Sequence, residues 1–437
     1  MQVDKTTLAD LSIFHSEEEQ SVFYHLNHTQ TNGGREYLRY LLANPHDTLE
    51  EILDTQQTIK QMMVVAKDWP VTVTNGTIMV IERYYESQIN NFTQHPNAVN
   101  STIYRVLNAP DYSLIRYTVE HAIDFYKGMQ MIVDLLQQQT MSKQLVTWVT
   151  RLSMLLNKAT IQEMMFEDKK KLTPEQVLRY GGFIRHHYKS QNFELVDLYS
   201  RFDAYLSVAW ACQKYHFHFP EVQKSSEPFI KAKGLHHMLL TDPVSYDIEL
   251  NIENNFLFLT GANMAGKSTF IKAVGVAAYM AHLGFGVPAQ QMQLSLLDGL
   301  LSNIQVVDNI IKGESFFFNE VQRIRNTIEK ISDGRLWLIL IDELFKGTNQ
   351  QDAVKCSTTV IEGLRKMKNA VFILSTHLYE IGDDLRKYKN IQFHYFETSV
   401  KDDQLQFSYQ LKEGISNDRL GYLILKREGV VELLDKL

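Results

Sequence analysis

Apolar residues recur at three- and four-residue spacing through most of the first half of the chain. Two clear examples are LEEILDTQQTIKQMM at residues 49–63 and IDFYKGMQMIVDLLQQQ at residues 123–139. This spacing places apolar side chains on one face of an α-helix. Strand-like segments are scarce in this part of the chain, so we expect residues 1–225 to form an all-helical domain.

The hydrophobic pattern changes after residues 220–229. That segment, PEVQKSSEPF, mixes proline, serine and charge, as linkers between domains do. Beyond it, short apolar runs alternate with helical patterns. The runs are FLFLT at 256–260, LWLILI at 336–341 and AVFIL at 370–374. Continuous apolar strands are typical of a largely parallel sheet covered by helices. The predicted fold class is therefore α plus α/β, with a helical domain over 1–225 and an α/β domain over 226–437.

A glycine-rich motif follows the first apolar run directly. It satisfies G-x-x-x-x-G-K-[ST] and leads into an apolar helix, the context in which such loops bind nucleotides. Gly261 and Gly266 allow the backbone to turn tightly around phosphate oxygens. Lys267 can reach the β- and γ-phosphates, and Ser268 can bind Mg²⁺. The predicted ATP-binding residues are Gly261, Ala262, Asn263, Met264, Ala265, Gly266, Lys267, Ser268 and Thr269.

The other two apolar runs also end in polar residues that suit this chemistry. Asp342 and Glu343 follow the second run, where Asp342 would hold Mg²⁺ and Glu343 would polarise the attacking water. His377 follows the third run and could sense the γ-phosphate at the carboxyl edge of the sheet. The alternatives are an acidic pair that is merely solvated and a histidine with a structural role.

A basic cluster in the helical half is the best candidate for contact with DNA. Its members are Lys169, Lys170, Lys171, Arg179, Arg185 and Lys189. Phosphate neutralisation by such residues supplies most sequence-independent affinity for nucleic acids. Thr173 and Pro174 resemble an N-cap and a first-turn proline, so a helix should begin beside the cluster. The alternative is a solvated helix face.

Composition narrows the class of protein further. The net charge of −7 and the 44% hydrophobic content describe an ordinary globular chain. The only two cysteines, Cys212 and Cys356, lie far apart and form no C-x-x-C motif, which argues against a disulfide framework or a zinc site. No basic, apolar leader opens the chain and no apolar run reaches the roughly 18 residues of a membrane span. We expect a cytoplasmic protein with no membrane contact.

Several segments together resemble the MutS family of DNA mismatch-repair ATPases. In the second half the resemblance rests on GANMAGKST, GVPAQ, KGESFFFNEVQRI, LILIDELFKGTN and STH. In the first half, LNHTQTNGGREYLRYLLANP at 26–45 resembles the start of the family's lever domain, and FDAYLSVAW at 202–210 resembles its closing helix. P-loop proteins in general lack these additional segments, so the resemblance is specific.

The resemblance implies an ATPase with ATP and Mg²⁺ as ligands. Asn263, Lys267, Ser268 and Thr269 match residues that bind phosphate and metal, and Asp342 and Glu343 match those beside Mg²⁺ and the water. His377 matches the family's switch histidine. Ser315 matches the serine that the family presents in trans to the neighbour's γ-phosphate, which implies a homodimer.

Lever-like sequence begins within the first thirty residues, so we expect neither a mismatch-binding nor a connector domain. No segment over about 55–190 resembles the DNA-encircling clamp. We therefore expect duplex or branched DNA as the target, without mismatch specificity. The alternatives are a ribosome-directed ATPase of the other MutS branch and a non-catalytic, ATP-gated scaffold for repair partners.

Overall fold

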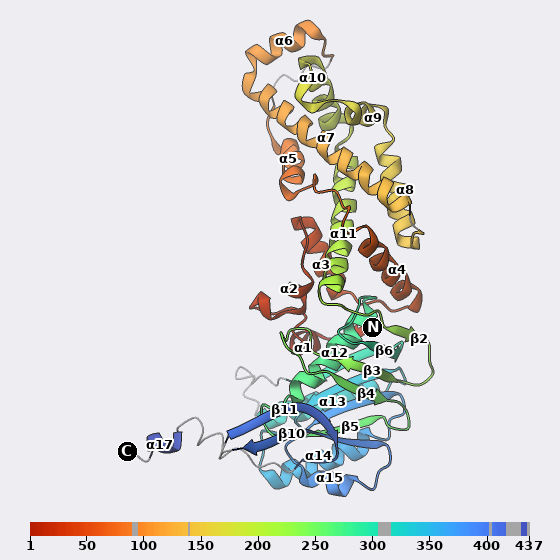
Figure 1. Cartoon of the computed structure of the whole chain (residues 1–437), viewed down its shortest axis with the longest axis vertical. Helices are drawn as coiled ribbons and strands as arrows, with labels where there is room; N and C mark the ends of the chain where they lie inside the picture. The colour runs from red at the N-terminus through yellow and green to blue at the C-terminus, as the bar shows by residue number, and fades with distance from the viewer. Residues whose placement is uncertain (90–94, 139, 305–315, 402–403, 417–429, 435–437) are drawn as a thin grey trace. The chain divides into compact units, whose positions relative to one another are not determined.

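A computed structural model describes the chain except for residues 90–94, 139, 305–315, 402–403, 417–429 and 435–437 (Figure 1). The chain folds into two compact units. One unit contains Met1–His25, Asn44–Leu53 and Tyr215–Leu437, and the other contains Leu26–Ala43 and Asp54–Lys214. The chain enters the first unit for the last time at Tyr215, a few residues before the boundary predicted at 220–229. In the part of the chain that the structure describes, no helix combines the length and apolarity needed to cross a membrane.

The second unit is built from helices, as the apolar spacing predicted. In chain order its α-helices include α3 (Asn32–Ala43), α4 (Leu49–Val65, which enters this unit at Asp54), α5 (Asn75–Glu86), α6 (Ala98–Leu107), α7 (Ala109–Gln137), α8 (Lys143–Leu156), α9 (Ala159–Phe166), α10 (Pro174–Gly182) and α11 (Lys189–Lys214). α10 begins where Thr173 and Pro174 predicted a helix start. The Thr173 hydroxyl accepts a hydrogen bond from the backbone N–H of Gln176, whose side chain caps Thr173 in return.

The two lever-like segments pack against each other inside this unit. The buried carboxylate of Asp203 in α11 accepts hydrogen bonds from the backbone N–H groups of Gln30 at 2.9 Å and Thr31 at 2.8 Å. A Cβ on Gly34 in α3 would lie 2.1 Å from a carboxylate oxygen of Asp203. The close approach therefore requires glycine, and the carboxylate caps the start of α3 in place of water.

The first unit contains a seven-stranded sheet with the order β1-β7-β8-β9-β5-β10-β11. Its strands are β1 (Gln2–Val3), β5 (Phe256–Thr260), β7 (Gly299–Asn303), β8 (Trp337–Asp342), β9 (Ala370–Ser375), β10 (Ile391–Lys401) and β11 (Gln404–Glu413). All neighbours pair in parallel except β10 and β11. The three apolar runs became the adjacent strands β8, β9 and β5, so their carboxyl ends lie side by side.

A smaller sheet with the order β2-β6-β3-β4 belongs to the same unit. It contains β2 (Glu221–Gln223), β3 (Ile230–Leu235), β4 (Tyr246–Leu250) and β6 (Gln291–Ser295). The helices of the unit include α1 (Lys5–Asp10), α12 (Lys267–His282), α13 (Phe316–Ile331), α14 (Gln350–Leu364) and α15 (Glu380–Leu385). The chain thus combines helices with mixed sheets, which confirms the predicted fold class at this level.

Two short strands, β2 at Glu221–Gln223 and β1 at the amino terminus, contradict the expectation that residues 1–225 are all-helical. Gln2 and Val3 form β1, which pairs in parallel with Gly299 and Leu300 of β7. The buried carboxylate of Asp10, just beyond, accepts hydrogen bonds from Ser302 and the backbone N–H of Ile304. A two-residue strand is too short to show a periodic pattern in the sequence. Whether it forms depends on the neighbouring strand with which it pairs.

Candidate nucleotide site

The predicted phosphate loop connects β5 to α12. Its backbone adopts positive φ angles at Gly261 (138°), Met264 (66°) and Gly266 (109°). At Gly261 a Cβ would also lie 3.2 Å from the backbone oxygen of Phe396. Side chains other than glycine rarely adopt such φ values, so the two motif glycines are required by the shape of the loop. The first turn of α12 then points its N–H groups toward the loop, as anion-binding helices do.

Lys267 is held inside this loop. Its side chain is only 5% exposed, and its Nζ donates hydrogen bonds to the carbonyl oxygens of Gly261 at 2.8 Å and Ala262 at 2.9 Å. Burial lowers the pKa of Lys267 to about 8, although the nearby carboxylates of Glu343 and Asp342 oppose that shift. The ammonium group is thus placed where phosphate oxygens could replace the loop carbonyls as acceptors.

Asp342 ends β8 and is nearly buried, at 8% exposure. Its two carboxylate oxygens accept hydrogen bonds from the hydroxyls of Ser268 and Ser375, one each. The hydroxyl and the carboxylate that were predicted to bind Mg²⁺ therefore lie in direct contact. Oxygen ligands of this kind fit Mg²⁺, which usually takes one or two protein groups and fills its shell with phosphates and water. Within the described residues, no group of three or more His, Cys, Asp or Glu could hold a metal by itself.

Glu343 follows Asp342 with a positive φ of 63°, and its backbone N–H donates to the Ser375 carbonyl oxygen at 3.0 Å. Its Oε1 lies 2.6 Å from His377 Nε2, and its Oε2 lies 3.0 Å from Lys346 Nζ. Burial would raise the pKa of Glu343, but the hydrogen bonds and charges of His377 and Lys346 outweigh it and lower the pKa to about 2. The carboxylate is therefore ionised at neutral pH and oriented by two partners.

A cavity of about 480 Å³ opens beside the loop. Its lining includes Asn263, Met264, Gly266, Lys267, Ser268, Thr269 and Glu343, together with Leu240, Asp242, Val244, Tyr246 and Tyr409. The last five were not predicted from the sequence. They come from the β3–β4 segment and from β11, far from the motif, and no local pattern distinguishes them from ordinary strand and loop residues. Apart from Asp242, they add apolar and aromatic side chains to the lining of the cavity.

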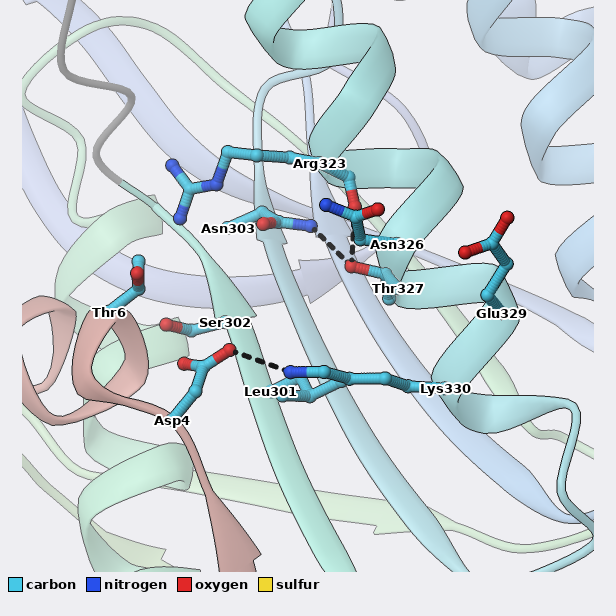
Figure 2. Close-up of a pocket in the computed structure, with 10 residues that line it drawn as sticks. All are labelled: Asp4, Thr6, Leu301, Ser302, Asn303, Arg323, Asn326, Thr327, Glu329 and Lys330. Atoms are coloured by element: carbon cyan, nitrogen blue, oxygen red, sulfur yellow. Dashed lines mark hydrogen bonds and ion pairs between the residues drawn. The ribbon is translucent and has the colours of Figure 1, made fainter. Parts of the chain in front are cut away.

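A second cavity of about 490 Å³ lies beside α13, β7 and the amino-terminal segment, as Figure 2 shows. Asp4 pairs with Lys330 across it at 3.3 Å, and Asn303 Nδ2 donates to Thr327 Oγ1 at 3.3 Å. Its described lining carries charges of both signs and includes no residue of the phosphate loop. This second cavity is therefore less suited to bind a polyanion than the cavity beside Lys267.

Three members of the basic cluster have hydrogen-bond or ion-pair partners within the chain. Lys169 pairs with Asp124, and Arg179 forms a bidentate ion pair with Glu163. Arg185 donates to the backbone carbonyl oxygens of residues 84 and 87, both at 2.6 Å. Cations with such partners attract phosphates less strongly.

The other three members of the cluster have looser surroundings. Lys171 Nζ lies 3.7 Å from a carboxylate oxygen of Asp168, and Lys189 Nζ lies 5.5 Å from the ring centroid of Tyr85. Lys170 is exposed. Contact between the cluster and DNA stays a prediction, and these three lysines are the members best placed to make it.

Ser315 lies outside the described residues, so the structure does not place it. α13 begins directly after it, at Phe316. The remaining predicted site residues, from Gly261 to Thr269 and at Asp342, Glu343 and His377, come together at the carboxyl ends of β5, β8 and β9.

Comparison with known proteins gives a consistent picture. Residues 257–432 match the model of MutS domain V. A DNA mismatch repair protein MutS from Aquifex pyrophilus is 30% identical over 229 residues, which cover 52% of this chain and 26% of that protein. The protein of the same name from Petrotoga mobilis is 27% identical over 278 residues, covering 62% of this chain and 33% of that protein. The chain thus spans about a third or less of the length of these curated relatives.

Proposed function

The chain is a member of the MutS family through its domain V, and on that premise we propose that it hydrolyses ATP to ADP and phosphate in the cavity beside Lys267. The observation that supports this most is the meeting of three separate segments: the loop and Glu343 line one cavity, Asp342 contacts Ser268 of the loop, and His377 contacts Glu343. The loop at 261–269, the acidic pair at the end of β8 and His377 after β9 lie far apart in sequence. A structural role for each segment alone would not require them to converge.

The residues divide the work of phosphoryl transfer among them. Lys267 neutralises charge on the β- and γ-phosphates, while the loop N–H groups bind phosphate oxygens. Ser268 and Asp342 would hold Mg²⁺, which neutralises phosphate charge when bound. Glu343 orients the attacking water by accepting its hydrogen bond. His377, in contact with Glu343 at 2.6 Å, reports whether the γ-phosphate is present.

The apolar and aromatic part of the cavity lining suits a purine base. Tyr409 is 42% exposed and lines the cavity with Leu240, Val244 and Tyr246. An exposed aromatic ring at the mouth of a nucleotide cavity offers a flat surface on which the adenine can stack. We assign Tyr409 this role.

ATP turnover would switch a homodimer that acts on DNA. The names of the relatives, DNA mismatch repair protein, support DNA as the target. Ser315, presented to the partner's nucleotide, would make each site complete only in the dimer. We favour duplex or branched DNA as the target. We also propose that the protein is cytoplasmic and meets its target in the cytoplasm. Ribosomes, or repair partners held by a non-catalytic scaffold, remain the alternatives.

A turnover assay with matched variants tests this proposal. Lys267→Ala should abolish ATP hydrolysis because it removes the phosphate-binding charge. Lys387→Ala removes an exposed lysine of the same unit, paired with Glu362, and should leave hydrolysis unchanged. Equal activity in the two variants would refute the site. A binding panel of duplex, mismatched duplex, branched DNA and ribosomes, with and without ATP, then separates the candidate targets.

A further inference from the structure

Glu320, in the second turn of α13, is a buried carboxylate that reaches the loop following Glu343. Its side chain is only 5% exposed. One carboxylate oxygen accepts a hydrogen bond from the backbone N–H of Lys346 at 3.1 Å, and the other accepts from Gly347 at 3.2 Å. A carboxylate is costly to bury unless such donors satisfy it. Two consecutive N–H groups aimed at one carboxylate fix the path of the loop at residues 346–347.

The loop that Glu320 holds is strained. Glu343 and Phe345 have positive φ angles of 63° and 59°, although neither is glycine. Such conformations are uncommon for residues other than glycine and persist only where the surroundings hold them. Lys346 connects the two carboxylates, because its N–H binds Glu320 while its ammonium lies 3.0 Å from Glu343 Oε2. Glu320 thus holds the backbone of Lys346, the residue whose ammonium group contacts Glu343.

The rest of α13 is anchored, so its amino-terminal turns have a defined position. Thr327 bonds to Asn303 of β7, and Lys330 pairs with Asp4, both at 3.3 Å (Figure 2). At the other end, the ring of Phe317 packs 5.7 Å from that of Phe345. Glu320 therefore lies on a helix that has contacts on both sides of it.

We propose that Glu320 is a positioning residue for hydrolysis, acting through Lys346 on Glu343, the water-orienting carboxylate of the same protomer. This inference rests on the proposed ATPase function. Glu320 does not line the nucleotide cavity, whose described lining includes Glu343 but no residue of α13. It should therefore affect the chemical step and leave nucleotide binding intact.

Glu320→Gln tests the role because it keeps the size of the side chain but places an amide donor against a backbone N–H. We expect kcat for ATP to fall about 10- to 100-fold, the range for misplaced catalytic groups. The Kd for ATP should stay close to wild type. Glu320→Asp keeps the acceptor charge and should retain more activity. Glu329→Gln, on the same helix and 59% exposed beside Arg325, is the matched control and should change nothing.

A double-mutant cycle with Lys346→Met distinguishes positioning from general support of the fold. If Glu320 acts through the Lys346 ammonium, Glu320→Gln should lower kcat little further once that ammonium is gone. Additive losses, or a normal kcat in Glu320→Gln where Lys267→Ala is inactive, would overturn the role of Glu320 without touching the proposed function. If Glu320→Gln does not fold, Glu320→Asp replaces it in the same double-mutant cycle, and the same comparison of kcat values tests whether Glu320 acts through Lys346. Activity in Lys267→Ala would instead refute the ATPase site itself.

Discussion

Acid should destabilise the unit that carries the nucleotide site through His282, the last residue of α12. The ring is fully buried. Its Nδ1 lies 2.9 Å from the Ala278 carbonyl oxygen, and its Nε2 accepts a hydrogen bond from the backbone N–H of Leu297 at 2.9 Å. These contacts select the neutral ring with the proton on Nδ1. Burial lowers the pKa of His282 to about 4 from an ordinary value of 6.5.

The sign and size of the effect follow from these two values. Between pH 6.5 and pH 4 the unfolded chain binds a proton that the folded chain does not, so the free energy of unfolding falls as the pH falls. At pH 5 the loss relative to neutral pH is about 2 kcal/mol, and below pH 4 it approaches about 3 kcal/mol. A loss of this size is a large fraction of the stability of a typical domain.

Urea unfolding at pH 7 and pH 5 measures this loss. Carboxylates also titrate in this range, so the informative quantity is the difference between wild type and His282→Gln. The variant should lose about 2 kcal/mol less than wild type between the two pH values. His15→Gln, at an exposed histidine of the same unit, should behave as wild type. Equal acid sensitivity in wild type and His282→Gln would refute the reasoning.

Two further predictions concern the nucleotide. Mixing Ser315→Ala chains with Lys267→Ala chains should restore turnover, because a heterodimer then has one site with both groups intact; an inactive mixture in which heterodimers are demonstrated by mass would disprove the assignment in trans. Tyr409→Ala should weaken ATP binding up to about tenfold, since aromatic stacking contributes about 0.5–1.5 kcal/mol. Tyr409→Phe should bind ATP as wild type does, and calorimetry that finds equal affinity in Tyr409→Ala would remove the tyrosine from the base site.

The core of the site could be predicted because its signals are local. The strand before Gly261 and the strands before Asp342 and Ser375 are continuous apolar runs, and parallel pairing brings their carboxyl ends to one edge. A site at that edge then requires only a suitable polar residue at the end of each strand. This is why a pattern read along the chain located residues that meet in space.

What could not be predicted depends on contacts between distant segments. The charge pattern around Lys169 shows Asp168 nearby but not Asp124, which lies 45 residues earlier and pairs with it. The hydrogen bonds of Glu320 to residues 346–347 and the place of Tyr409 in the cavity likewise arise only from tertiary packing. From the sequence alone, an acidic residue on an amphipathic helix is predicted to be exposed. Only the tertiary fold shows that backbone N–H donors meet the carboxylate of Glu320 in the interior.

The most direct test of the account is the separation of ATP binding from ATP hydrolysis in Glu343→Gln. The amide keeps the size of the side chain but can no longer present an ionised acceptor to the attacking water. We expect the variant to bind ATP with near wild-type affinity, to accumulate as an ATP-bound dimer, and to hydrolyse ATP at least about a hundredfold more slowly in single-turnover assays. Glu362→Gln, at a partly exposed glutamate of the same unit, should hydrolyse ATP at the wild-type rate. Wild-type turnover in Glu343→Gln would contradict the assignment of hydrolysis to this cavity.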